Sequence, residues 1–344
     1  MKVGIIGATG YGGADLIRIL QTHPAVKAIS LYTSSKEGRL ISETYPHLTE
    51  IAPFPLEKID PVAIANKDDL VFLATPSGVS SKLAPELLNA GSTVIDLSGD
   101  FRLKNPAQYE KWYNKAPGPD QWLEKAIYGL TEANREKVKE AKLLSNPGCY
   151  PTATLLGLLP LVKEEMLQPN SIIVDAKSGV SGAGRSPALG SLYSELNDNL
   201  KIYKVNEHQH IPEIEQVLKS WGYHSPITFH THLVPMTRGI MATIYGTVKN
   251  KTTVEALLEL YKEYYDQETF IRVREKGSFP ATKEVSGSNY CDVGIAYDER
   301  TQRVTIVSVI DNVMKGAAGQ AVQNANIMFG IEETTGLNFI PLYP

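Results

Sequence analysis

Cysteine is scarce in this 344-residue sequence, which contains only Cys149 and Cys291. Two cysteines cannot build a disulfide framework, and these two do not have the spacing of metal ligands. Such sparse use of cysteine is typical of proteins that work in a reducing compartment. The composition therefore favours a cytoplasmic protein and excludes a disulfide-stapled secreted scaffold.

Long hydrophobic runs and blocks of like charge are also missing. The longest apolar stretch, residues 153–162, contains a proline and is too short to cross a bilayer. An apolar strand pattern begins at residue 2, so we expect no signal peptide. The 34 basic and 38 acidic residues are mixed along the chain and give a net charge of −4, so we expect no membrane and no nucleic acid as partner.

The length and the 42% of apolar residues suit two domains better than one. In the first part, short apolar segments alternate with amphipathic ones, of which residues 13–21 predict a helix. Strands that are apolar throughout and separated by helices indicate a parallel sheet covered on both faces. The strands expected in this α/β, Rossmann-type domain are residues 2–7, 26–33, 70–74, 93–97 and 143–145.

After about residue 150 the expected strands are longer and more alternating. Their pattern predicts an α+β domain with a mixed or antiparallel sheet and helices on one face. A last segment of small residues, 315–330, predicts a helix that could return to pack on the first domain. The expected strands are residues 172–177, 230–234, 239–248 and 304–310, and the expected helices include residues 254–265 and one before Trp221.

Glycines cluster between the first strand and the first helix, in the motif GATGYGG at residues 7–13. Glycine there lets the backbone turn tightly and approach a pyrophosphate, whose charge meets the helix N-terminus. The spacing G-x-x-G-x-x-G is less common than G-x-G-x-x-G and also suits a structural turn, but its position favours dinucleotide binding. The residues expected to contact the cofactor are Gly7, Thr9, Gly10, Tyr11, Gly12 and Gly13.

The end of the second strand indicates which dinucleotide is bound. An acidic residue there would hold the ribose 2′-hydroxyl of NAD, but the sequence has Ser34, Ser35 and Lys36 instead. A carboxylate would repel a 2′-phosphate, whereas hydroxyls and an ammonium group can bind one. We therefore expect NADP(H); the alternative is that the two serines only cap a loop.

The sharpest chemical signal is Cys149, in the segment SNPGCYPT at residues 145–152. The cysteine follows a tight turn and precedes Pro151, a good first-turn residue, and an apolar helix over residues 152–162. A thiol at a helix N-terminus meets the positive end of the helix dipole, which favours the nucleophilic thiolate. The alternative for a lone cysteine is a small buried hydrophobe, and we assign that role to Cys291.

Thiolate catalysis needs an acid or a base nearby in space. The motif HQHIPE at residues 208–213 places His210 at the start of a helix, with Glu213 one turn on and able to orient an imidazole. His208 is the second candidate. A metal site would need further ligands at suitable spacing, and the sequence does not support one, so we expect no metal.

Two further segments follow predicted strands. The loop GVSGAGR at residues 179–185 could wrap a phosphate or the nicotinamide end of the cofactor with Ser181 and Gly182, or be a plain surface loop. Asn312 lies between a strand and the small-residue helix. Its side chain could bind the carboxamide of the cofactor or cap that helix.

Five motifs together resemble the N-acetyl-γ-glutamyl-phosphate reductase family of arginine biosynthesis: GATGYGG, NPGCYPT, SGVSGAGR, HQHIPEI and DNVMKGAAGQAVQNAN. The resemblance covers nearly the whole chain, and motifs in a shared order are far more specific than any one of them. It implies NADPH-dependent reduction of a small-molecule acyl phosphate, N-acetylglutamyl 5-phosphate, to the semialdehyde through a cysteinyl thioester. It also implies an NADP-binding domain of residues 1–148 and 316–344, a catalytic and dimerisation domain of residues 149–315, and a homo-oligomer, either a dimer or a tetramer.

Carried over residue by residue, the family's nucleophile falls on Cys149, and its histidine motif, usually H-R-H-x-P-E, falls on residues 208–213. Gln209 replaces the usual arginine and leaves both histidines in place. We favour His210 as the acid/base because its neighbours continue into the Pro-Glu pair, and we keep His208 as the alternative. The substrate's carboxylate calls for a cation, for which the candidates are Arg102, Arg185 and Arg238.

Two other functions are open at this point. A sister acyl-phosphate reductase of the same fold could act on aspartyl phosphate or on a carrier-linked aminoadipyl phosphate. An acidic carrier protein would want a basic docking surface, which the even charge mixture does not suggest. A protein of another class, a non-catalytic NADP-binding redox sensor, would not need a reactive cysteine loop together with a histidine motif.

Overall fold

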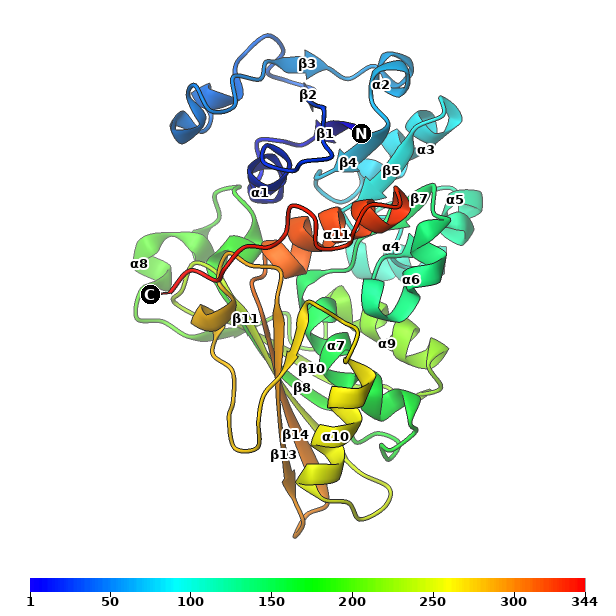
Figure 1. Ribbon diagram of the computed structural model, residues 1–344, viewed down its shortest axis with the longest axis vertical. Helices are drawn as coiled ribbons and strands as arrows, with labels where there is room; N and C mark the ends of the chain where they lie inside the picture. Colours follow the sequence, from blue (N-terminus) through cyan, green and yellow to red (C-terminus); the bar gives the residue numbers. More distant parts are fainter. Residues whose placement is uncertain (344) are drawn as a thin grey trace. The chain divides into compact units, whose positions relative to one another are not determined.

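The computed structural model describes residues 1–343, which divide into two compact units (Figure 1). The sequence placed all of residues 316–344 in the first domain. Residues 339–343 instead belong to the second unit, where the amide of Leu342 donates to the carbonyl of Ser286 at 2.8 Å. Unit 1 consists of Met1–Pro147 and Ala317–Asn338, and unit 2 of Gly148–Gly316 and residues 339–343.

Unit 1 is built on a seven-stranded sheet whose paired strands are all parallel. The strand order β3-β2-β1-β4-β5-β7-β6 reverses next to β1, and ligands of such sheets bind at the carboxyl ends of the strands around that switch point. β4 and β5 are buried along their whole length, so the predicted α/β Rossmann-type domain is confirmed. The strands are β1 Lys2–Ile6, β2 Ala28–Thr33, β3 Leu56–Lys58, β4 Leu70–Leu73, β5 Thr93–Asp96, β6 Ile127–Tyr128 and β7 Leu143–Ser145.

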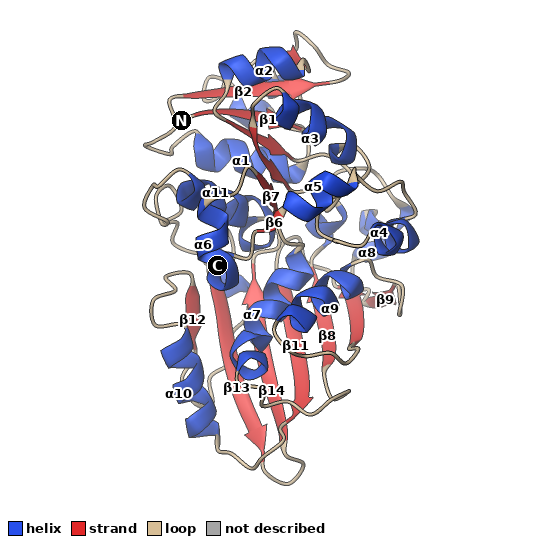
Figure 2. Ribbon diagram, turned by 90° about the vertical axis from the view of Figure 1, so that its right-hand side faces the viewer, coloured by secondary structure: helices blue, strands red, loops and turns tan. Residues whose placement is uncertain are grey.

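Five helices of unit 1 form two groups, one of α1, α6 and α11 and the other of α2 and α3 (Figure 2). Helix α1 buries Leu16, Ile17 and Leu20 on one face, as the amphipathic pattern predicted. No helix within residues 1–343 is long and apolar enough to span a membrane. The helices are α1 Tyr11–Leu20, α2 Pro61–Lys67, α3 Ser80–Asn89, α4 Pro106–Tyr113, α5 Asp120–Lys125, α6 Thr131–Lys139 and α11 Gly319–Met328.

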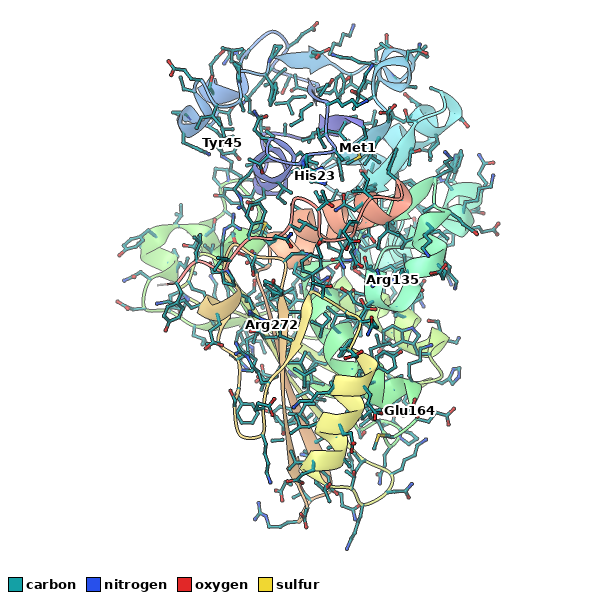
Figure 3. The ribbon with its side chains drawn as sticks, in the orientation of Figure 1. Met1, His23, Tyr45, Arg135, Glu164 and Arg272 are labelled. Carbon is teal, nitrogen blue, oxygen red and sulfur yellow. The ribbon has the colours of Figure 1, made fainter. Side chains whose placement is uncertain are left out.

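Polar contacts hold the late helix α11 in unit 1. The ring of His23, labelled in Figure 3, is buried and its Nε2 lies 2.9 Å from Oδ1 of Asn326. The hydroxyl of Thr131 donates to Oδ1 of Asn324 at 2.8 Å. Breaking these bonds would leave buried polar groups unpaired, which is costly, so the bonds favour α11 in this place. The small-residue helix therefore returns to the first domain, as the sequence suggested.

Unit 2 is built on a mixed seven-stranded sheet of order β12-β13-β14-β11-β8-β10-β9. β11 is antiparallel to both β14 and β8, whereas β10 is parallel to β8, so the predicted mixed sheet is confirmed. In Figure 2, α7, α9 and α10 lie together on one face of this sheet. The elements are α7 Cys149–Lys163, β8 Ile173–Ser178, α8 Tyr193–Leu196, β9 Lys201–Tyr203, α9 His210–Ser220, β10 Thr228–Leu233, β11 Ile240–Thr247, α10 Val254–Tyr264, β12 Ile271–Val273, β13 Cys291–Asp298 and β14 Arg303–Ile310.

Helix α7 is the centre of unit 2, and every residue of it from Tyr150 to Val162 is buried. Pro160 lies inside the helix and has no amide to donate to the carbonyl of Leu156. The hydroxyl of Tyr265 donates to that carbonyl instead, at 2.5 Å. The proline is therefore accommodated without an unpaired carbonyl, and the helix that begins at Cys149 stays fixed against the sheet.

Candidate active site

Cys149 is the first residue of α7, with Gly148 as the N-cap. The sequence predicted a helix from residue 152, so the structure brings the cysteine into the first helical turn. Its side chain is partly exposed, unlike that of the buried Cys291. Both the amide and the hydroxyl of Thr152 bond the Gly148 carbonyl at 2.9 Å, which closes this turn. A partly exposed cysteine at the positive end of a 15-residue helix is in a position that favours the thiolate.

Asn146, the last residue but one of the first segment of unit 1, has every polar group engaged. Its amide donates to the Asp96 carbonyl at 2.8 Å, and its side chain bonds the Ala317 carbonyl at 3.1 Å and Asn324 at 3.2 Å. Its carbonyl accepts from Nε of Arg102 at 2.8 Å. Because all four groups are held, the backbone of unit 1 is fixed at Asn146, three residues before Cys149.

Arg102, expected to bind substrate, is buried in the structure. Besides the Asn146 carbonyl, its guanidinium donates from Nη2 to the carbonyl of Leu97 at 3.0 Å. These contacts are with the backbone, and they join the loop after β5 to the segment before the cysteine. Sequence reasoning missed the part played by Asn146, because its partners lie far away along the chain.

His208 is a buried ring among the aromatic side chains of Tyr150, Tyr203 and Phe229. Burial, with a smaller effect of Lys204, lowers its pKa to about 3. Its Nδ1 accepts the backbone amide of His210 at 3.1 Å, which assigns the remaining proton to Nε2. His208 is therefore a neutral ring that caps the start of α9.

His210 and Glu213 converge on the residue that precedes the cysteine. Both are buried and lie in the first turn of α9. A β-carbon at Gly148 would be only 2.5 Å from Nε2 of His210, so the imidazole lies directly against this glycine. Oε1 of Glu213 accepts the Gly148 amide at 2.8 Å. The sequence placed the two side chains one turn apart; the structure adds their shared target beside Cys149.

The burial of His208 predicts a pH dependence of stability. Because its folded pKa of about 3 lies below the ordinary 6.5, the unfolded chain binds one more proton between these values. The contribution of His208 to the free energy of unfolding is complete above pH 6.5 and is lost as the pH falls. The free energy of unfolding falls by about 1.4 kcal/mol for each pH unit below 6.5. Urea unfolding at pH 7 and at pH 5 measures this fall. Between these two pH values, wild type should lose about 2 kcal/mol more of its free energy of unfolding than His208→Asn does. Equal pH dependence of the two proteins would contradict this.

Ser181 and Asn312, distant in sequence, meet in unit 2. Nδ2 of Asn312 donates to the Ser181 hydroxyl at 2.9 Å, and its Oδ1 accepts the amide of Gly239 at 2.7 Å. A β-carbon at Gly182 would lie 3.5 Å from the same amide nitrogen of Asn312. Asn312, just after β14, thus joins the glycine loop to the segment that contains Gly239.

The two other candidate arginines differ in their surroundings. Arg185 is exposed on the glycine loop. Nη1 of Arg238 lies 3.3 Å from each carboxylate oxygen of the buried Asp311, with the arginine side chain one third exposed.

The glycine motif of unit 1 forms the turn between β1 and α1. Gly7 has a φ of +91° and its α-carbon lies against the Ala74 carbonyl, so that a β-carbon would come within 2.4 Å of this oxygen. Gly13 packs as closely on Gly7, since a β-carbon at position 13 would come within 2.5 Å of the Gly7 carbonyl oxygen. Gly12 instead has open space in front of it. Packing explains the first two glycines, and Gly12 leaves room for a ligand at the start of α1. Thr9, Gly10 and Tyr11 complete this turn, with the Thr9 carbonyl bonded to Tyr45 and Gly10 as the N-cap of α1.

A cavity of about 550 Å³ opens at the carboxyl end of β2. Ser34 and Ser35 line it, and the lysine that lines it with them is Lys58 rather than Lys36. Nζ of Lys36 donates to the hydroxyl of Thr44 at 3.5 Å. Lys58 ends β3, whose three residues were too few to predict from sequence. The other lining residues are Thr33, Glu37 and Ile59.

The described residues 1–343 contain no group of three or more His, Cys, Asp or Glu side chains that could hold a metal ion. The groups brought together are the Cys149 thiol at the start of α7 and the His210 imidazole and Glu213 carboxylate at the start of α9. This arrangement can perform nucleophilic catalysis with proton transfer.

Comparisons with known proteins give one consistent family. The profile described as "Semialdehyde dehydrogenase, NAD binding domain" matches residues 2–141, and "Semialdehyde dehydrogenase, dimerisation domain" matches residues 149–312. The chain is 62% identical to an N-acetyl-γ-glutamyl-phosphate reductase of Geobacillus thermodenitrificans and 58% identical to one of Bacillus subtilis, each over 100% of both chains. Aspartate semialdehyde dehydrogenase II of Vibrio cholerae has the same fold, with a TM-score of 0.73 and 19% identity over 96% of this chain and 98% of that one.

Proposed function

Because the chain belongs to the semialdehyde dehydrogenase family, among its N-acetyl-γ-glutamyl-phosphate reductases, we propose that it reduces N-acetylglutamyl 5-phosphate to the 5-semialdehyde with NADPH. The reaction passes through a thioester on Cys149. The observation that carries the mechanism is the partly exposed thiol at the start of α7, with His210 and Glu213 against the residue before it.

The chemistry needs two steps at one sulfur. The Cys149 thiolate attacks the acyl carbonyl, the carbon–oxygen bond to phosphate breaks, and inorganic phosphate leaves. NADPH, when bound, supplies the hydride that reduces the thioester. The thiohemiacetal then collapses to the aldehyde and releases the thiolate. His210 gives a proton to the carbonyl oxygen as it gains charge and takes one back during collapse.

Glu213 and His208 support the two groups that react, the Cys149 thiolate and the His210 imidazole. Glu213 holds the Gly148 amide, which keeps Cys149 at the helix start. His208 stays neutral at physiological pH because of its lowered pKa, and we assign the proton transfer to His210 for this reason. Since phosphate is a good leaving group, the protein mainly has to position the reactants and stabilise the oxyanion.

Residues described above would hold the cofactor. In unit 1, the turn of Gly7, Thr9, Gly10, Tyr11, Gly12 and Gly13 would receive the pyrophosphate at the start of α1. Ser34 and Ser35 would bind the 2′-phosphate, with Lys58 as its cation. In unit 2, Ser181, Gly182 and Asn312 would hold the nicotinamide end.

The lysine assignment makes a direct prediction. A charge-assisted hydrogen bond contributes about 1.5–3 kcal/mol, so Lys58→Ala should raise the KM for NADPH about 10- to 100-fold. The KM for NADH should change less than about twofold, because NADH has no 2′-phosphate. Lys36→Ala is the matched control and should have the smaller effect. A larger loss in Lys36→Ala than in Lys58→Ala would return the 2′-phosphate to Lys36.

Among the arginines, Arg185 is our first choice for the substrate's carboxylate because it is exposed on the glycine loop. Arg238 is the second, with part of its side chain accessible. Arg102 is buried on backbone carbonyls, and we give it the task of fixing the segment before Cys149.

A reverse assay tests the substrate. N-acetylglutamate semialdehyde, NADP⁺ and phosphate or arsenate should give NADPH at least about 100-fold more efficiently than aspartate semialdehyde does. The missing methylene alone accounts for about 10–200-fold, and a free ammonium group adds mismatched polar contacts. Comparable kcat/KM for the two aldehydes would assign the chain to a sister acyl-phosphate reductase. Tight NADP binding without any turnover would favour the redox sensor.

We also propose a cytoplasmic homo-oligomer, a dimer or a tetramer. The two free cysteines fit a reducing compartment. The face of the unit 2 sheet opposite α7 is only half-buried, at residues such as His230, His232 and Tyr245. A second copy of the chain could cover this face.

A further inference from the structure

The residues after β14 form a π-helix, Met314–Ala318. Its wider turn appears in the bond from the Gly316 amide to the carbonyl of Asp311, five residues earlier, at 3.0 Å. Such turns are rare and often lie at functional sites, because they shift the backbone relative to an ordinary helix. This one brings Gly316 to the nucleophile.

Gly316 is in contact with Cys149. A β-carbon at position 316 would lie 2.7 Å from the β-carbon of Cys149, 3.1 Å from its α-carbon and 3.2 Å from Ile310. Separations below 3 Å between such atoms force a shift, and a helix backbone cannot yield cheaply. The backbone of the π-helix therefore packs directly against Cys149 and limits the positions that this residue can take.

Asp311 holds the start of the π-helix. It is completely buried, and its Oδ1 accepts the amides of Val313 and Met314 at 2.9 and 3.0 Å. Oδ2 accepts the amide of Gly287 at 2.7 Å, and Arg238 lies 3.3 Å from both oxygens. One carboxylate thus ties the first turn of the π-helix to two other loops of unit 2.

We propose that Asp311 is a positioning residue for the reaction, which acts on Cys149 through the π-helix and its contact at Gly316. The proposal rests on the proposed function, in which Cys149 is the nucleophile. Asp311 keeps Gly316 against Cys149, and Gly316 keeps the sulfur at the start of α7, where the thiolate is favoured. Loss of the carboxylate would let the π-helix relax and move the thiol from this position.

The test uses Asp311→Asn and Gly316→Ala in the full chain. Asparagine keeps the shape but turns an amide towards backbone amides that need an acceptor. The alanine methyl pushes on Cys149 directly. Misplacement of a reacting group by about 1 Å can cost about 100-fold in rate, so kcat should fall about 10- to 100-fold in both variants. The KM for NADPH should change less than about twofold.

Iodoacetamide alkylation of Cys149, followed by peptide mass spectrometry over a range of pH, is the readout that separates positioning from simple destabilisation. We expect slower alkylation at pH 7 and a higher midpoint pH in both variants. Gly157→Ala is the matched control, because its methyl would crowd Ile244 at 2.8 Å further along α7. It should lower the thermal unfolding midpoint and leave the alkylation profile unchanged.

The outcomes are distinct. Wild-type kcat and an unchanged alkylation profile in Gly316→Ala, or in a folded Asp311→Asn, would overturn the positioning proposal and leave the thioester mechanism standing. Full activity of Cys149→Ala would instead remove the mechanism on which the proposal rests. Should Asp311→Asn not fold, Gly316→Ala alone decides, because its methyl points at the nucleophile.

Discussion

Cys149→Ala is expected to lower turnover by at least about 10³-fold, since removal of an enzyme nucleophile is among the most damaging single changes known. In the proposed mechanism the sulfur forms the covalent intermediate, and the alanine methyl group cannot form that bond. NADPH binding should stay close to wild type, because the expected cofactor contacts lie in other residues. Steady-state kinetics and fluorescence titration of NADPH measure the two effects separately.

Cys291→Ala is the matched control for this experiment. Cys291 is buried in β13, with its sulfur 3.4 Å from the hydroxyl of Ser308. Its loss should reduce stability a little and leave kcat within about twofold, since a small core cavity costs stability rather than chemistry. Iodoacetamide should modify Cys149 well before Cys291. More than a few per cent of turnover in Cys149→Ala would show that the thioester mechanism is wrong.

His210→Asn is expected to depress kcat by about 10²–10⁴-fold, the usual contribution of general acid–base catalysis. The KM of the substrate should change less, because the imidazole acts on the proton rather than on substrate affinity. The pH profile of the residual activity should lose one ionisation. His210 is a better candidate than His208 because the latter is held neutral and spends its Nδ1 on the His210 amide.

His208→Asn is the comparison for the histidine assignment. It should destabilise the start of α9 and weaken substrate affinity more than it lowers kcat, because the ring caps the helix that carries His210. A larger loss of kcat in His208→Asn than in His210→Asn would exchange the two roles. Little effect in either variant would direct attention to His230 and His232.

The α/β domain and the mixed-sheet domain were predictable because their strands differ in pattern. β4 and β5 are apolar throughout, whereas β11 alternates buried and half-buried residues along its length. β13 escaped prediction, since Asp292 and Gly294 interrupt its apolar pattern. Both are explained only by tertiary contacts: Asp292 pairs with Arg272, and Gly294 lies under Pro280.

The candidate site was predictable where it is local in sequence. A turn followed by the start of a helix marks Cys149 in the sequence, and a second helix start marks His210 and Glu213. Contacts between distant segments were not predictable, because no local pattern records them. Lys58 reaches the cavity at the end of β2 only through the pairing of β2 with β3, and Arg102 reaches the Asn146 carbonyl only in the folded loop.

The most direct test of the mechanism omits NADPH. Mixing the enzyme with N-acetylglutamyl phosphate should release a rapid burst of about one inorganic phosphate per subunit, since acylation precedes reduction. Intact-protein mass spectrometry of the quenched sample should show one N-acetylglutamyl group, and peptide mapping should place it on Cys149. Cys149→Ala should give neither burst nor adduct, and Cys291→Ala should give both. Phosphate release that requires NADPH, or an adduct on any other residue, would contradict a thioester at Cys149.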